Sequence, residues 1–385
     1  HFLPGDAQGL AKVEDFDVPA LTRQLKAMGA SYFVLTLGQN SGFFNSPNAV
    51  YDGIVGAAPG ERCARCDLPL DLYRALRPEG IRLMLYLPCQ TPNADRRAQR
   101  AFGLPEGRQD QPIDEEFAHK WAKVIHEWSA RYGDKVAGWW FDGGYQHVQF
   151  NEAIARIYAD AVKRGNPKAI VTFNPGVRLV RHTRAEDYTA GELNEPFDVL
   201  PTSRWVDGSQ WHALTYLGSS WSRRDTRQPT ERWVRWVRAV VEKGGAVTLD
   251  LGPNWDSAAG PIGTFDAAQV AQVKAPRPKL PGGQHAHGLP RGALGQLRVA
   301  PVVQAGRELK VARVHKSLAP PIVRDAGGVA PLSHSAIRAL TLPGDIDVIL
   351  HLGGVELVAH PAKVAPVHLK DHLVVDAIPL RAIQP

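Results

Sequence analysis

The sequence has few cysteines, no long apolar run and no dense block of basic residues. Its 385 residues include only Cys63, Cys66 and Cys89, too few for a disulfide scaffold. No stretch of about 18 apolar residues occurs, so we predict no membrane span. The net charge of +6 is spread along the chain, which argues against nucleic acid as a partner.

The pair Cys63 and Cys66 has the spacing of metal ligands, but the sequence contains no second pair. A structural zinc site usually takes four protein ligands. We therefore predict a local disulfide or two idle thiols at this pair in preference to zinc.

The chain begins on His1, without a methionine or a signal segment. We interpret the start as cut, by processing or because the gene is partial, so the compartment stays unknown. A secreted or periplasmic protein with its signal segment removed is one hypothesis. An amino-terminal histidine also chelates copper through its amine and ring, which leaves an oxidative polysaccharide-cleaving enzyme as an alternative.

The carboxyl-terminal segment, residues 276–385, contains no aromatic residue, Asn, Cys or Met, although the chain has 10 Trp, 9 Tyr and 12 Phe. Our preferred interpretation is translation in a shifted frame. A small β module is the alternative, with strand-like runs at 345–352 and 372–380, although β domains normally draw on aromatic residues. We divide the chain into a domain, residues 1–275, and this tail, to which we assign no function.

Residues 1–275 alternate between β-rich runs and amphipathic helical segments. After a first strand at the amino terminus, strands are expected at 32–37, 81–87, 136–141, 170–174, 211–217 and 246–251. Helices are expected at 18–28, 68–76, 117–132, 150–164, 230–243 and from 267, and the stretch 178–210 is expected to be irregular. About eight such units match an α/β fold of the (β/α)8 TIM-barrel type. A doubly wound open sheet is the alternative, but no G-x-G-x-x-G follows a strand.

The predicted strand 136–141 ends on Asp142, which two glycines follow. Barrels of this type place their chemistry at the carboxyl ends of strands, so Asp142 is the first candidate catalytic residue. The alternative is that it only caps a turn. Because side chains alternate along a strand, we expect Trp140 on the side of Asp142, and Trp139 and Phe141 in the core.

Four stretches of the domain resemble the α-L-fucosidases of glycoside hydrolase family 29. Residues 33–43 (FVLTLGQNSGF) resemble a strand that ends in Lys-His-His-Asp-Gly-Phe, and residues 73–86 a helix–strand unit with the pattern A-V-R-x-x-G-L-x-x-G-L-Y-Y. Residues 140–143 (WFDG) are similar to the segment of the nucleophile. Residues 211–221 resemble W-E-T-C-M-T-x-x-x-S-W and lead to 244–253, which resemble G-G-N-L-L-L-N-I-G-P.

This resemblance implies a catalytic barrel that cleaves a terminal fucose, or a related sugar, from a fucosylated or related glycan by retaining hydrolysis, without metal or cofactor. Some sugar contacts differ. Gln39 and Asn40 stand where the family has a His-His pair, His212 where it often has Glu, and Asp250 in place of an Asn. We therefore expect a substrate related to, but not necessarily equal to, a plain fucoside.

Retaining hydrolysis needs two carboxyl groups about 5–5.5 Å apart, one as nucleophile and one as acid/base. Position and resemblance give Asp142 the role of nucleophile. The resemblance implies that the acid/base comes from a loop about 40–60 residues after the nucleophile. Five acidic residues lie in that window: Glu186, Asp187, Glu192, Glu195 and Asp198. We favour Glu192, because residues 188–192 resemble the short T-P-E segment of the family, and place Glu195 second.

The remaining candidate substrate-binding residues are aromatic platforms and hydroxyl-binding groups at strand ends. They are Trp140, Tyr145, Trp211, Trp221, His1, Gln39, Asn40, Asn174 and His212, with core packing as the alternative for each ring. Two other functions stay open. A non-catalytic carbohydrate-binding barrel is one, because the His-His pair is missing. A metal-dependent hydrolase on the same barrel is the other, but this sequence has no His and acidic residues at the spacing of metal ligands.

Overall fold

The structure, a computed structural model, describes residues 5–90, 94–108 and 110–274 and five short strands beyond them. The chain divides into two compact units, His1–Gln296 and Leu297–Pro385. In the second unit, β9 (Ile322–Asp325) pairs with β10 (Gly328–Pro331), and β11 (Val348–Leu352) pairs with β12 (Val355–Ala359) and that with β13 (Ala382–Ile383), all antiparallel. The run predicted at 345–352 contains β11, whereas 372–380 and His1 lie outside the described residues.

Four parallel strands form the first part of the barrel wall. They pair in the order β1 (Tyr32–Thr36), β2 (Arg82–Pro88), β3 (Val136–Asp142) and β4 (Ile170–Phe173). Further along the chain, β7 (His212–Tyr216) pairs in parallel with β8 (Ala246–Asp250). A small antiparallel hairpin precedes β7, and each of its strands has two residues, β5 (Trp205–Val206) and β6 (Ser209–Gln210).

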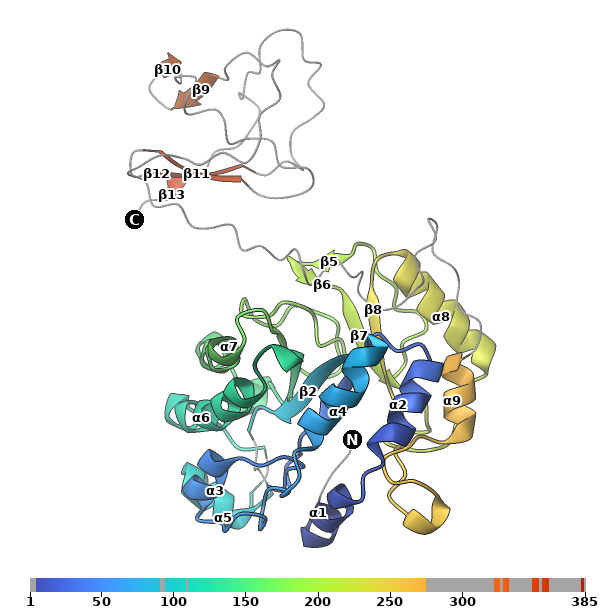
Figure 1. Cartoon of the computed structure of the whole chain (residues 1–385). Helices are drawn as coiled ribbons and strands as arrows, with labels where there is room; N and C mark the ends of the chain where they lie inside the picture. Colours follow the sequence, from blue (N-terminus) through green and yellow to red (C-terminus); the bar gives the residue numbers. More distant parts are fainter. Residues whose placement is uncertain are drawn as a thin grey trace. The chain divides into compact units, whose positions relative to one another are not determined.

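Two connections join these sheets into a ring. Between β4 and β7 runs an extended segment, residues 187–193: the Asp187 N–H donates to the Val171 oxygen, and the Leu214 N–H donates to the Gly191 oxygen. Between β8 and β1, the Tyr32 hydroxyl donates to the Val247 oxygen at 2.9 Å. The strands lie inside and the helices outside (Figure 1), which confirms the predicted (β/α)8-type barrel.

All six predicted helices are present, and three short ones are added. The predicted ones are α2 (Val18–Ala27), α4 (Leu68–Leu76), α6 (Glu115–Tyr132), α7 (Glu152–Gly165), α8 (Thr230–Glu242) and α9 (Ala267–Lys274). The additional ones are α1 (Ala7–Glu14), α3 (Ala49–Val55) and α5 (Arg96–Phe102). Each of these three begins after a capping residue, Asp6, Asn48 or Asp95, whose side chain accepts from a backbone N–H of the first turn.

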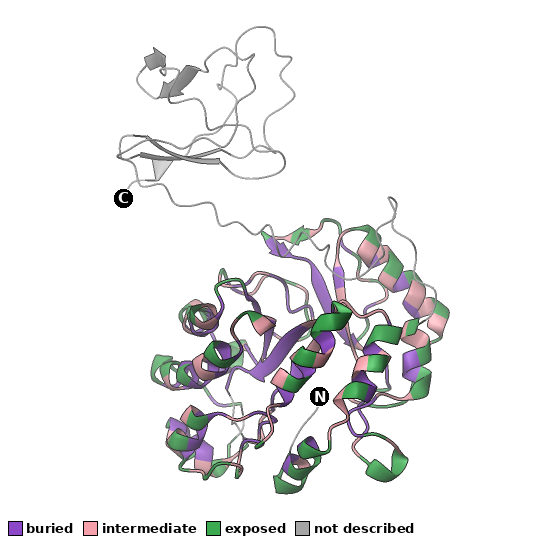
Figure 2. Cartoon of the chain, viewed as in Figure 1, coloured by how far each residue is buried: buried purple, intermediate pink, exposed green. Residues whose placement is uncertain are grey.

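The main core lies between the outer face of the strands and the helices (Figure 2). Trp139 and Phe141 belong to this core, stacked 5.9 Å apart, whereas Trp140 faces the barrel interior and stacks on Tyr86 at 5.2 Å. The alternation predicted for β3 is therefore confirmed. Three helical tryptophans, Trp128, Trp233 and Trp236, are buried against the barrel, also as predicted.

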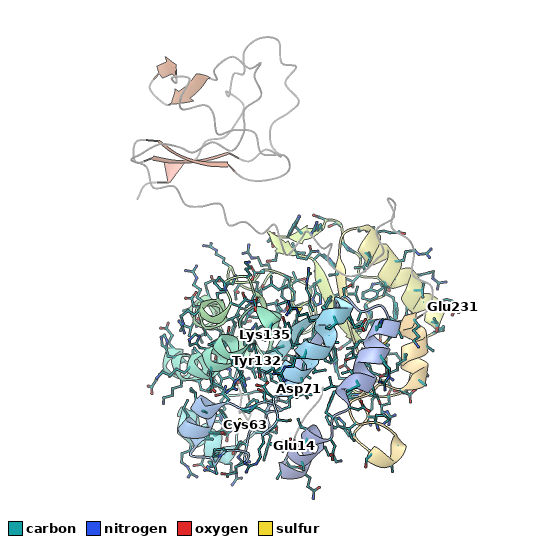
Figure 3. All side chains as sticks on the ribbon, viewed as in Figure 1. Glu14, Cys63, Asp71, Tyr132, Lys135 and Glu231 are labelled. Carbon is teal, nitrogen blue, oxygen red and sulfur yellow. The ribbon has the colours of Figure 1, made fainter. Side chains whose placement is uncertain are left out.

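The cysteines are free thiols, and Cys63, labelled in Figure 3, is buried. Of the two alternatives for the Cys63–Cys66 pair, the structure therefore has the unlinked one. Within the described part of the chain, no three His, Cys, Asp or Glu side chains come together as metal ligands. No described helix is long and apolar enough to cross a membrane.

Candidate active site

Asp142 stands at the carboxyl end of β3, where three donors from different parts of the chain hold its carboxylate. The Tyr86 hydroxyl donates to Oδ2 at 2.5 Å. The Gly143 N–H and the Asn174 Nδ2 donate to Oδ1 at 2.8 and 2.9 Å. A residue that only caps a turn would need the contact with the Gly143 N–H alone. The additional side chains fix the orientation of the carboxylate at the mouth of the barrel.

Asn174, which directly follows β4, binds two carboxylates with one amide nitrogen. Its Nδ2 donates to Asp142 at 2.9 Å and to Glu192 Oε2 at 2.5 Å. Its Oδ1 accepts the Gly176 N–H at 3.1 Å, which fixes the amide orientation. The two carboxylate oxygens are therefore at most about 5.4 Å apart, the sum of 2.9 and 2.5 Å. The structure brings together the three predicted residues Asp142, Glu192 and Asn174.

Glu192 reaches this position because of the glycine before it. The segment 187–193 forms two isolated parallel bridges, Tyr188 with Gln210 of β6 and Glu192 with Leu214 of β7. Gly191 has φ +60°, and a β-carbon there would lie 1.9 Å from the His212 backbone oxygen. Only glycine permits this approach. The sequence predicted an irregular stretch here and missed the strand-like pairing, because the bridges are too few to leave a periodic pattern.

The surroundings of Glu192 and Tyr145 raise the pKa of both side chains. Burial and the nearby charge of Asp142 raise the pKa of Glu192, and the hydrogen bond from Asn174 lowers it in part. Burial and the charges of Asp142 and Glu192 also raise the pKa of Tyr145, so its hydroxyl keeps its proton. Glu192 is thus favoured as a proton donor, and Tyr145 as a neutral hydrogen-bonding group beside it.

Gln39 supports Asp142 indirectly. It follows β1, and its Nε2 donates to the Tyr86 hydroxyl, which in turn donates to Asp142. Its neighbour Asn40 lies in the same loop, where its backbone oxygen accepts the Ala94 N–H. Sequence reasoning missed Tyr86. No local pattern marks it, because the register between β2 and β3 is what places Tyr86 opposite Trp140 and beside Asp142.

Trp140 and Trp221 lie at different depths. Trp140 has only 5% of its surface exposed, stacks on Tyr86 and donates from Nε1 to the Ala190 oxygen at 3.3 Å. It packs against Tyr86 in the barrel interior and has little free face for a sugar. Trp221 follows β7 and packs 4.7 Å from Tyr216, near the carboxyl end of that strand.

The structure does not bring three of the predicted residues to the carboxylates. Trp211 is buried in a cluster with Trp233 and Trp236, on the helix side of the strands. His212 stands at the amino end of β7, where its ring nitrogens meet the Thr189 oxygen and the Thr248 hydroxyl. Glu195 is exposed and pairs with Arg227 at 3.0 Å. The sugar contacts predicted for Trp211 and His212 are therefore corrected. The resemblance gave the place of these residues in the sequence, but not the face or the end of β7 on which each side chain lies.

A pocket of about 600 Å³ opens beside Glu192. The loops after β3 and β4 form it. Its lining residues are Tyr145, Gln146, His147, Pro175, Gly176, Val177, Arg178 and Glu192. Small-molecule sites typically measure about 300–1,000 Å³, so the pocket is large enough for a sugar residue.

Comparison with known proteins supplies a family. A family model described as Alpha-L-fucosidase matches residues 7–273. None of the curated protein sequences compared with the chain matches it.

Two of the solved structures with a similar fold are glycoside hydrolases. An endo-fucoidan hydrolase, MfFcnA4 of glycoside hydrolase family 107, has 18% identity and a TM-score of 0.55 over 68% of this chain and 49% of its own. An alpha-L-fucosidase of family 29 from Bacteroides thetaiotaomicron has 19% identity and a TM-score of 0.50 over 70% of this chain and 62% of its own. The chain thus spans about half to two thirds of the length of these proteins, and at such identities the likeness shows the fold.

Proposed function

The chain belongs to the alpha-L-fucosidase family, and from that premise we propose that it is a retaining, exo-acting glycoside hydrolase. Its substrate is a glycan that ends in fucose or a related sugar. We assign the activity to residues 1–275 and none to the tail, 276–385. No metal or cofactor enters the proposed reaction.

The contact of Asn174 with both carboxylates carries this proposal. It holds the facing oxygens of Asp142 and Glu192 at most about 5.4 Å apart. Retaining enzymes separate their two carboxyl groups by about 5–5.5 Å, whereas inverting enzymes need about 6.5–9.5 Å to admit a water molecule. The spacing therefore supports a direct attack by one carboxylate on the sugar.

In the proposed mechanism, Asp142 Oδ attacks the anomeric carbon while Glu192 gives its proton to the departing oxygen. The bond between the anomeric carbon and that oxygen breaks, and a glycosyl ester of Asp142 forms. Glu192, now a carboxylate, then takes a proton from water, whose oxygen attacks the same carbon and releases Asp142. The raised pKa of Glu192 suits the first step, because the residue must begin protonated.

The sugar itself is proposed more broadly than fucose. Where the family has its His-His pair, this chain has Gln39 and Asn40, and the Gln39 amide is engaged with Tyr86. A group that is bound to the site's own tyrosine contributes less to a sugar hydroxyl than a free one. This supports a related sugar, or a modified fucose, as an alternative substrate.

Kinetics on a panel of aryl fucosides and aryl galactosides test the proposal. We expect Asp142→Asn to lose essentially all turnover. Glu192→Gln should retain more activity on substrates with highly acidic leaving groups and regain activity with azide, a nucleophile that needs no general base. Glu195→Gln is the matched control, because Glu195 is exposed and pairs with Arg227.

Two outcomes would overturn this assignment. If Asp142→Asn cleaves the panel as well as the wild type, Asp142 is not the nucleophile. If the wild-type protein binds glycans in calorimetry and hydrolyses none, it is a non-catalytic carbohydrate-binding barrel.

A further inference from the structure

The wall of the pocket beside Glu192 carries one arginine. Arg178 is exposed, four residues after Asn174, and its Nη2 donates to the Pro175 oxygen at 3.3 Å. Within residues 5–90, 94–108 and 110–274, no carboxylate forms an ion pair with it. Most of its guanidinium donors therefore remain available to a ligand.

Two aromatic rings also line the pocket. The Tyr145 and His147 rings stack 5.2 Å apart, on the short helix η3 (Gln146–Val148) and the residue before it. Gly176 has φ +102°, and a β-carbon there would lie 3.9 Å from the Tyr145 ring. The loop thus turns against the ring and places Arg178 in the same pocket.

The charge in this pocket is positive when the enzyme is ready to react. Glu192 is the only acidic residue in the lining, and as a general acid it begins protonated and neutral. The carboxylates of Asp142 and Asp110 lie near Tyr145, outside the lining. Arg178 is then the lining residue that carries a permanent charge.

The position of Glu192 in the lining indicates which part of the substrate enters the pocket. Under the proposed function, Glu192 gives its proton to the leaving oxygen, so the sugar attached to that oxygen lies on the Glu192 side. We propose that this pocket binds an anionic substituent, a sulfate ester or a carboxylate, on the leaving-group sugar, and that Arg178 binds it. A planar guanidinium suits both oxyanions because it offers paired donors. This inference rests on the proposed function for the identity of the occupant.

Binding measurements test the pocket without requiring hydrolysis. Calorimetry at low ionic strength would compare galactose 6-sulfate, glucuronate and uncharged galactose on the full chain. We expect the best anion to bind at least about fivefold tighter than galactose, and added salt to weaken this preference. The affinities for galactose 6-sulfate and for glucuronate show whether the pocket prefers a sulfate ester or a carboxylate.

The variants Arg178→Gln, Arg178→Lys and, as a control, Arg235→Gln on the exposed side of α8 complete the design. Arg178→Gln should abolish the preference, Arg178→Lys should keep part of it, and Arg235→Gln should leave it unchanged. Equal affinity for anionic and neutral sugars, an unchanged preference in Arg178→Gln, or no measurable binding of either anion overturns the proposal. If the anions bind through Arg178 but no glycoside is cleaved, the pocket stands and the proposed hydrolysis falls.

Discussion

A substitution of Asn174 tests the site most sharply, because its side-chain amide contacts both carboxylates. Asn174→Leu replaces it by an apolar side chain of similar size, and removes the bonds to Asp142 and Glu192 together. It also leaves the Gly176 N–H without its acceptor. A matched control is Thr172→Val, two residues earlier on the same face of β4. The Thr172 hydroxyl is buried and has no partner among the described residues, so this change should leave the kinetics as they are.

The size of the effect follows from the charge on Glu192. As Glu192 gives up its proton, the bond from Asn174 changes from one with a neutral acid, worth about 1 kcal/mol, to one with a carboxylate, worth about 1.5–3 kcal/mol. Losing that difference costs about 0.5–2 kcal/mol in the transition state, or about two- to thirtyfold in kcat/KM. The bond to Asp142 weakens in the same step, so its loss acts through the orientation of the carboxylate and adds to the decrease.

The pH dependence of kcat/KM should shift in a defined direction when Asn174 is replaced. In the proposed mechanism Glu192 must begin protonated, so we expect activity to be lost as pH rises through the pKa of Glu192. The bond from Asn174 lowers this pKa, and therefore Asn174→Leu should move the alkaline limb to higher pH while it lowers kcat/KM. The assay is kcat/KM on an aryl glycoside across pH, with urea unfolding to verify that the variant is folded. A limb that moves to lower pH, or a kcat/KM within about twofold of the wild type, would refute the reasoning.

Three other changes follow from the same contacts. Tyr86→Phe removes the hydroxyl that donates to Asp142 and should lower kcat/KM by about tenfold or more with little change in urea stability; unchanged kinetics would show that the contact is idle. Gly191→Ala places a β-carbon 1.9 Å from the His212 oxygen and should destabilise the barrel as well as abolish turnover, so a variant that melts like the wild type would contradict the close approach of the two segments. Burial lowers the pKa of His212 to about 4, so its contribution to stability is full above about pH 6.5 and is lost as pH falls towards 4, by roughly 3 kcal/mol. His212→Gln should flatten this part of the urea-stability profile, and an equally steep profile in the variant would assign the loss to other groups.

The fold and part of the site follow from local pattern. The alternation of Trp139, Trp140 and Phe141 sorted the barrel interior from the outer core, and the acid at the end of the same strand proved to be held by three donors. The short helices α1, α3 and α5 were not predicted, because they have only seven or eight residues and depend on a capping side chain at the start.

Other features depend on contacts that a local pattern does not encode. Trp211 and His212 differ by one position and so face opposite sides of β7, and the site lies at the other end of that strand. The route by which Glu192 reaches the site runs through Gly191, whose role appears only when the His212 oxygen lies against it. Tyr86 is distant in sequence from Asp142 and is joined to it by the register between β2 and β3.

The most direct test of the account is whether the sugar becomes bonded to Asp142. The full chain would be incubated with 2-deoxy-2-fluoro-fucosyl fluoride, which slows the release of a glycosyl-enzyme ester, then digested and analysed by mass spectrometry. We predict release of the anomeric fluoride and one 2-deoxy-2-fluoro-fucosyl adduct, on the peptide that contains Asp142, and none in Asp142→Asn. A label on a different carboxylate, or a first-formed product of inverted anomeric configuration from an aryl fucoside, would contradict the central claim.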